Sequence, residues 1–265
     1  FSFKSVSKRY LTSKNKPKIA IFREQGVNGH KEMANAFKLV GFDCYDINTN
    51  DVIDKPSILD DFIGLVACGG FSYGDVLGAG RGWANKIIFN ENAYHSLSNF
   101  FSDKNKFTLG VCNGCQMLSN LKAIIPGSSH WPNFILNTSN QFESRQILVK
   151  VAKTNSILFK DMQSSILPVI VSHGEGKILI NKNRKIKKST LSFVDSFGKI
   201  TNQYPFNPNG SYQGATGFCN NDGRINIMMP HPERLIHINN FSWAPKEWKQ
   251  SPWLKFFNNA REWIN

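Results

Sequence analysis

The stretch FTLGVCNGCQMLSNL, residues 107–121, decides the fold. A short apolar run ends at Val111 and a segment with helical spacing follows directly, so the chain turns from strand to helix at Cys112. Glycine stands two residues before and two residues after this cysteine. A nucleophile at such a turn needs small neighbours, because larger flanking side chains would clash. The helix N-terminus behind it favours a thiolate. The stretch therefore predicts a nucleophilic cysteine at the end of a buried strand.

Strands and helices alternate on both sides of this turn. The predicted strands cover residues 18–22, 42–47, 62–68, 107–111, 146–151, 168–172 and 225–229. Helices are predicted near residues 33–40, from residue 83 onward, after residue 112 and at residues 251–264. This alternation predicts an α/β fold with a doubly wound, mainly parallel sheet, in one domain from residue 18 to residue 265.

The composition is that of a folded globular protein. The chain has 265 residues, of which 41% are hydrophobic and 19% charged, and this length suits one large domain or two small ones. No apolar run approaches the roughly 18 residues that a membrane-spanning helix needs. The five cysteines are an odd number in a chain too long for a disulfide-stabilised miniprotein, so we expect a reducing, cytoplasmic environment.

Most of the positive charge lies in two short segments. The formal net charge is +13, and residues 1–18 and 177–190 each hold six basic residues and no acidic one. A nucleic-acid-binding protein would usually spread such residues over a reading face, often with aromatic residues between them. We therefore expect residues 1–17 to be a linker from a preceding region and residues 182–188 to lie in a solvated loop. We expect no nucleic-acid partner.

A histidine and a glutamate near the C-terminal end complete a candidate catalytic set. His231 follows the last predicted strand, and the proline after it favours an extended backbone. In an extended segment residues i and i+2 point the same way, which places Glu233 beside His231. Cys112, His231 and Glu233 then match a catalytic triad, with nucleophile, base and orienting carboxylate. Alone, such a tripeptide is a weak signal.

Two other interpretations of the cysteine segment stay open. Cys112 and Cys115 form a C-x-x-C pair, which also suits a redox site or half a zinc site. A zinc site needs a second pair of ligands, which none of the other cysteines supplies, and we predict no metal site. Cys115 lies one helical turn beyond Cys112, so we expect it to be packed in the helix.

Glycine-rich segments supply the remaining candidates. Gly70 and Phe71, after the third predicted strand, could offer backbone N–H groups to an oxyanion together with Asn113, although a tight turn explains the same glycines. His173 ends another strand and is expected at the same edge of the sheet. The glycines at 78, 80 and 82 do not form a dinucleotide-binding motif, and no GxxxxGK[ST] motif for ATP occurs. His30, His95, His130 and His237 receive no role.

Longer motifs carry a resemblance to a known family. GVCNGCQML with a later HPE resembles class I (triad) glutamine amidotransferases. Further motifs resemble the glutaminase domain of phosphoribosylformylglycinamidine synthases, especially the large single-chain type, over about residues 17–265. These motifs are REQGVNGHKEM (23–33), ACGGFSYGDVLGAG (67–80), FESR (142–145), VSHGEG (171–176), YPFNPNGS (204–211), MMPHPER (228–234) and SPWLKFFNNAR (251–261). The resemblance implies a flavodoxin-like amidotransferase fold, and adds Gln116 to the residues expected to contact substrate.

The resemblance also implies a reaction. Cys112 would attack the side-chain carboxamide of glutamine and form a thioester, which water then hydrolyses to glutamate. The ammonia would pass to synthetase domains, expected on the same polypeptide, which aminate formylglycinamide ribonucleotide with ATP and Mg²⁺; no cofactor is expected in this chain. The alternative is a degraded or differently employed relative, such as another cysteine hydrolase or a structural partner.

Overall fold

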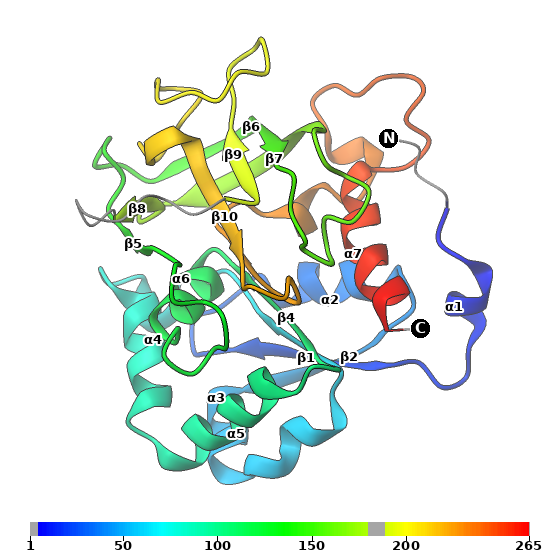
Figure 1. Ribbon diagram of the computed structural model, residues 1–265, viewed down its shortest axis with the longest axis vertical. Helices are drawn as coiled ribbons and strands as arrows, with labels where there is room; N and C mark the ends of the chain where they lie inside the picture. Colours follow the sequence, from blue (N-terminus) through cyan, green and yellow to red (C-terminus); the bar gives the residue numbers. More distant parts are fainter. Residues whose placement is uncertain (1–4, 180–188, 265) are drawn as a thin grey trace.

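A computed structural model describes residues 5–179 and 189–264 (Figure 1). The basic run predicted at residues 182–188 lies outside the described residues. Within them, one sheet has nine strands in the order β2-β1-β3-β4-β11-β10-β9-β6-β7, and a second sheet pairs β5 with β8. Five strands of the large sheet run parallel and the other four continue it antiparallel.

The parallel half holds five of the predicted strands. It consists of β1 (Lys18–Arg23), β2 (Asp43–Asn48), β3 (Gly64–Ala67), β4 (Phe107–Val111) and β11 (Ile225–Met228). Strands β3, β4 and β11 are buried along their whole length, as expected for apolar strands with helices on both faces. The expected α/β architecture with a mainly parallel sheet is therefore confirmed.

The antiparallel half holds both predicted and unpredicted strands. Strands β6 (Glu143–Val151) and β7 (Ile166–His173) are longer than expected, whereas β9 (Leu191–Phe193) and β10 (Ala215–Cys219) were not predicted. The small sheet of β5 (Asn133–Ile135) and β8 (Lys177–Leu179) was not predicted either.

Helices cover both faces of the parallel half. Helices α2 (His30–Lys38) and α7 (Pro252–Trp263) pack together on one face. The other face carries α3 (Thr49–Asp54), α4 (Ala79–Ile88), α5 (Glu91–Ser102) and α6 (Asn113–Asn120), as Figure 1 shows. Side chains of Asn90 and Ser251 cap the N-termini of α5 and α7. Short 3₁₀ helices are η1 (Pro56–Asp61), η2 (Ser72–Gly74), η3 (Tyr212–Gly214), η4 (Pro232–Leu235) and η5 (Ile238–Asn240).

The order of the parallel strands locates a crevice. Strand β1 has β2 on one side and β3 on the other, so the direction of winding reverses there. Ligands of open α/β sheets bind beyond the carboxyl ends of the strands near such a reversal. The segments after β3, β4 and β11 begin at Cys68, Cys112 and Met229, so the candidates Gly70, Cys112 and His231 all lie at this edge.

Part of the predicted linker contacts the domain. Within residues 5–17 the structure has a short helix, α1 (Lys8–Thr12), whose Tyr10 ring lies 4.3 Å from the guanidinium carbon of Arg261 in α7. A Cβ atom added at Gly41, where φ is +91°, would lie 2.6 Å from the Tyr10 carbonyl oxygen. Tyr10 therefore packs closely against both Gly41 and the end of α7.

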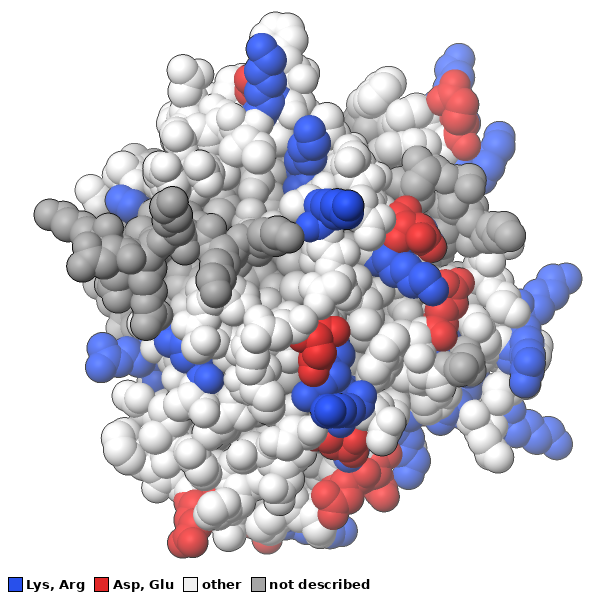
Figure 2. Space-filling model, in the orientation of Figure 1, with Lys and Arg blue, Asp and Glu red and all other residues white. Residues whose placement is uncertain are grey.

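The surface carries both signs of charge. On the face shown in Figure 2, Lys and Arg side chains are scattered among Asp and Glu side chains. Among the described residues, no helix is both long enough and apolar enough to cross a membrane.

Candidate active site

Cys112 sits at a strained turn. Its backbone has φ +52° and ψ −109°, and α6 begins at the next residue. A Cβ atom at Gly110 would lie 2.6 Å from the Leu118 side chain, and one at Gly114 would lie 2.1 Å from the Ala67 carbonyl oxygen. Both positions therefore need glycine, as the sequence pattern indicates for an elbow. A positive φ at a non-glycine residue costs energy and is found preferentially at functional sites.

His231 and Glu233 form a buried pair. His231 Nδ1 lies 2.6 Å from Glu233 Oε1, and the two residues are 1% and 2% exposed. The backbone N–H of His231 donates to the Ile170 carbonyl oxygen of β7 at 2.8 Å, which fixes the segment after β11. The structure therefore places Glu233 beside His231, as the sequence predicts.

The surroundings of His231 favour its charged form. Burial opposes protonation, but the negative charges of Glu233 and Cys112 outweigh it and raise the pKa of His231 to about 10. The charged imidazolium therefore lies beside Cys112, and it carries a proton that it can give to a leaving group.

Cys112 and His231 lie next to each other across Gly69. A Cβ atom at Gly69 would be 2.7 Å from His231 Cε1 and 3.1 Å from Cys112 Cβ. His231 Nε2 is buried and has no hydrogen-bond partner among the described residues. Cys112 Sγ lies 3.5 Å from the Ser172 carbonyl oxygen. Glu233 thus engages Nδ1, and Nε2 is the ring nitrogen of His231 that remains for proton transfer beside Cys112.

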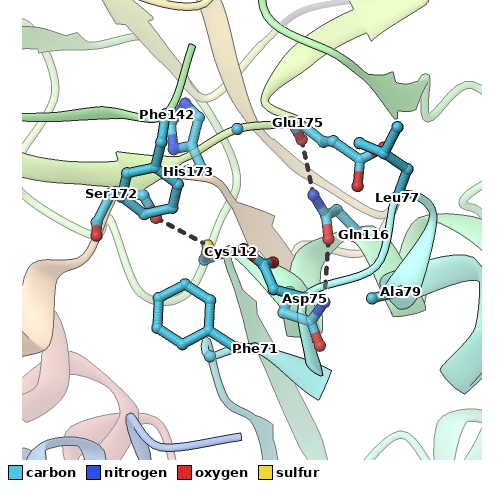
Figure 3. A pocket seen from close by; sticks show the side chains of 13 residues that line it. Phe71, Asp75, Leu77, Ala79, Cys112, Gln116, Phe142, Ser172, His173 and Glu175 are labelled. Atoms are coloured by element: carbon cyan, nitrogen blue, oxygen red, sulfur yellow. Dashed lines mark hydrogen bonds between the residues drawn. The ribbon is translucent and has the colours of Figure 1, made fainter. Parts of the chain in front are cut away.

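A pocket opens over Cys112 (Figure 3). The space between its walls is about 460 Å³, which includes open solvent. Its lining comes from the turn after β3, the start of α6 and the end of β7 with the following turn. The lining residues are Gly70, Phe71, Asp75, Leu77, Ala79, Cys112, Asn113, Gln116, Phe142, Ser172, His173, Gly174 and Glu175.

The backbone amides near the nucleophile differ in availability. Asn113 is the first residue of α6, and neither its amide nor that of Gly70 donates to another group in the part of the chain that the structure describes. The Phe71 amide donates to the Gly26 carbonyl oxygen at 3.1 Å. The Phe71 amide is therefore already engaged in this structure, and the Phe71 side chain forms part of the pocket wall.

Gln116 is held in place on the opposite wall. Its Nε2 donates to the Glu175 carbonyl oxygen at 2.7 Å, and its Oε1 accepts from Asn113 Nδ2 at 3.2 Å (Figure 3). A Cβ atom at Gly80 would lie 2.5 Å from Gln116 Cβ, so a glycine in α4 makes room for it. One pocket is thus lined by the predicted site residues Gly70, Phe71, Cys112, Asn113 and Gln116. His231 lies beside Cys112, and Glu233 is bound to His231.

Cys115 differs from Cys112 in its surroundings, because it does not line the pocket. It is fully buried in α6, as expected, and burial together with the charge of Cys112 raises its pKa well above the usual value. The two cysteines are not joined by a disulfide. Among residues 5–179 and 189–264, no group of three His, Cys, Asp or Glu side chains is placed to hold a metal ion.

Several pocket residues were not singled out from the sequence. Asp75, Leu77, Phe142 and Glu175 lie in motifs that carried the resemblance, but nothing in their local pattern marked them as lining residues. Phe142 contacts Phe71, with ring centroids 6.0 Å apart. His173 lines the pocket, as expected. Phe71 and Phe142 are far apart in the sequence, so their contact forms only in the folded chain.

Comparisons with known proteins identify the family and the fold of the chain. The chain matches the family model of the CobB/CobQ-like glutamine amidotransferase domain over residues 16–264. It is similar to a chain in the structure of PurLQS from Thermotoga maritima, with 20% identity, a TM-score of 0.68, and coverage of 95% of this chain and 100% of the other. A putative GMP synthase component from Thermoplasma acidophilum has 15% identity and a TM-score of 0.55, with 95% and 96% covered. The expected flavodoxin-like amidotransferase fold is confirmed, and the chain belongs to the family of CobB/CobQ-like glutamine amidotransferase domains.

Proposed function

We propose that this domain hydrolyses glutamine to glutamate and ammonia through a thioester on Cys112. The observation that carries the proposal is the arrangement of Cys112, His231 and Glu233: a buried, carboxylate-bound imidazole beside a cysteine that faces a pocket. Class I amidotransferase chemistry needs these three groups in this order of contact.

The residues take the following roles. The Cys112 thiolate attacks the carboxamide carbon of the glutamine side chain. The resulting oxyanion receives hydrogen bonds from the free backbone amides of Gly70 and Asn113. His231, which holds the proton, gives it to the departing ammonia as the carbon–nitrogen bond breaks. It then takes a proton from water, which attacks the thioester and releases glutamate. Glu233 keeps His231 oriented and stabilises its charge.

We further propose that the ammonia serves the ATP-dependent amination of formylglycinamide ribonucleotide in purine synthesis. The long motifs that resemble phosphoribosylformylglycinamidine synthase support this choice, and the shared fold with a PurLQS chain is compatible with it. ATP and Mg²⁺ would bind to the synthetase part, which would be cytoplasmic and joined to this domain in one polypeptide.

Product analysis tests the proposal. The chain, combined with its synthetase part, is incubated with glutamine, and glutamate is measured with and without formylglycinamide ribonucleotide and ATP. We expect glutamate release, and we expect it to rise when the nucleotide and ATP are present. Glutamate release that does not change with this nucleotide would refute the purine assignment. The absence of any glutamate release would refute the glutaminase activity.

A further inference from the structure

A buried histidine beside the pocket has a ring nitrogen without a partner. His173 is 2% exposed, ends β7 and lines the pocket (Figure 3). Its Nδ1 is buried and makes no hydrogen bond within the described residues. An unpaired buried polar atom costs free energy, so a partner is expected when the pocket is filled.

The other ring nitrogen faces an amide whose orientation is fixed. Asn209 Nδ2 donates to the Gly176 carbonyl oxygen at 2.8 Å, and Asn209 Oδ1 accepts from the Ser211 amide at 3.0 Å. A carbonyl oxygen cannot donate and a backbone amide cannot accept, so the side-chain amide cannot be flipped. Its Nδ2 lies 3.5 Å from His173 Nε2.

This contact selects one tautomer of His173. A donor at Nε2 requires a lone pair there, so the proton of the neutral ring resides on Nδ1. A Cβ atom at Gly176 would lie 2.2 Å from His173 Nε2 and 3.0 Å from Asn209 Nδ2, so this approach needs glycine. Asn209 belongs to the YPFNPNGS motif, which the catalytic groups leave unexplained.

Burial and a neighbouring positive charge keep His173 neutral. Burial, and then the positive charge of His231, lower the pKa of His173 to about 3. Glu143 lies opposite His173 on the neighbouring strand β6, and its carboxylate forms an ion pair with Arg145. The carboxylate of Glu175, in the turn after β7, accepts from the Gly78 amide.

We propose that Asn209 is a positioning residue that holds His173 with its proton on Nδ1, and that this N–H donates to an oxygen of the bound glutamine. Asn209 does not line the pocket and acts only through His173. The inference rests on the proposed function, since it names a specificity contact of the same site.

The Asn209→Asp variant tests this coupling, because it changes the group at Nε2 from a donor to an acceptor. The neutral ring then carries its proton on Nε2, and Nδ1 regains a proton only when the ring is charged, near a pKa raised by the new carboxylate. We expect KM for glutamine to rise about tenfold at high pH and to recover at low pH, with kcat changed much less. In the wild type His173 stays neutral over the same pH range, so its titration should not change KM.

Asn207→Asp is the matched control. Asn207 is equally buried in the same motif, and its Nδ2 donates to the carbonyl oxygens of Thr201 and Ser211, away from His173. Asp loses one hydrogen bond to a backbone carbonyl at position 209 and two at position 207, so the control carries at least as much damage to the fold. Only the Asn209 variant should gain a pH-dependent KM; the same pH dependence in both variants would overturn the proposal.

A measurement on the unliganded wild type needs no variant and no activity. Nitrogen-15 chemical shifts of the histidine rings distinguish the two tautomers. We expect the proton of His173 on Nδ1 throughout the neutral range. A proton on Nε2 would refute the role of Asn209 even if glutamine is hydrolysed, whereas a correct tautomer in a protein that releases no glutamate would refute the glutaminase alone.

Discussion

Cys112 and His231 meet across a residue that has no side chain. The position of a Cβ atom at Gly69 lies between them, 2.7 Å from the His231 ring and 3.1 Å from Cys112 Cβ. Distances this short leave no room for a methyl group. The contact between nucleophile and base therefore depends on glycine at this point of the turn after β3.

We expect Gly69→Ala to lower kcat at least about 100-fold, because a shift of the order of 1 Å between reacting groups costs about that much. Glutamate release by the purified variant measures it. Gly82→Ala is the control, since a Cβ atom there meets only ordinary contacts with Tyr73, and alanine suits a helix better than glycine. Equal activity of Gly69→Ala and wild type would contradict the close contact.

The two cysteines of the elbow should respond differently to serine. Cys112→Ser should abolish glutamine-dependent synthesis while ammonia-dependent synthesis survives, because the proposed amination site belongs to the synthetase part. Cys115→Ser should keep most of the glutamine-dependent rate and lose about 1 kcal/mol of stability, since it places a hydroxyl in the core. Equal loss of activity from both variants would favour a redox or metal pair.

Glu233→Gln should leave the fold intact and slow thioester formation by about two to four orders of magnitude, because the carboxylate orients His231 and stabilises its charge. It should also lower the pKa of His231, which the charge of Glu233 helps to raise. Rapid-quench kinetics and histidine NMR measure the two effects. A variant as fast as wild type would mean that Glu233 does not orient His231.

His173 should make the fold sensitive to acid. The unfolded chain binds a proton at this histidine below about pH 6.5, whereas the folded protein resists it until about pH 3. The unfolded state thus holds more protons in this window, so stability falls as pH falls, by at most about 1.4 kcal/mol per pH unit. Urea unfolding of His173→Gln should show a shallower loss between these pH values, and an unchanged slope would show that His173 does not titrate as described.

Much of the parallel half could be predicted, because its strands are short apolar runs that end in glycine or helical signals. Strand β10, ATGFC, could not, since its alanine and glycine have little strand preference and the pairing with β9 and β11 supplies its stability. Strands of three residues give too little pattern to be recognised.

The placement of Cys112, His231 and Glu233 could also be predicted, but their surroundings could not. The spacing of Cys112 and its glycines, and of His231 and Glu233, is local information. The bond that occupies the Phe71 amide comes from Gly26, in the turn after another strand. Likewise, Asn209 reaches His173 from a loop that follows it by more than thirty residues. Such contacts depend on how the loops are stacked at the sheet edge, which no short motif encodes.

The glutaminase is expected to depend on its synthetase partner. An uncoupled glutaminase would waste glutamine, and coupling requires a two-state element whose equilibrium both sites shift. We expect this domain alone to release glutamate slowly, and the rate to rise when synthetase domains with bound ligands are added at saturating glutamine. A domain already at full rate without them would refute the coupling and leave the glutaminase assignment intact.

Covalent labelling tests the central claim, that Cys112 is the nucleophile, most directly. The protein is treated with a glutamine analogue that carries an electrophilic carbon in place of the carboxamide, and the modified peptide is identified by mass spectrometry. We expect a single label on Cys112, slowed by excess glutamine and lost in Cys112→Ser. A label that falls on Cys115 or on several cysteines alike, or that glutamine does not slow, would contradict the assignment of this cysteine as the nucleophile.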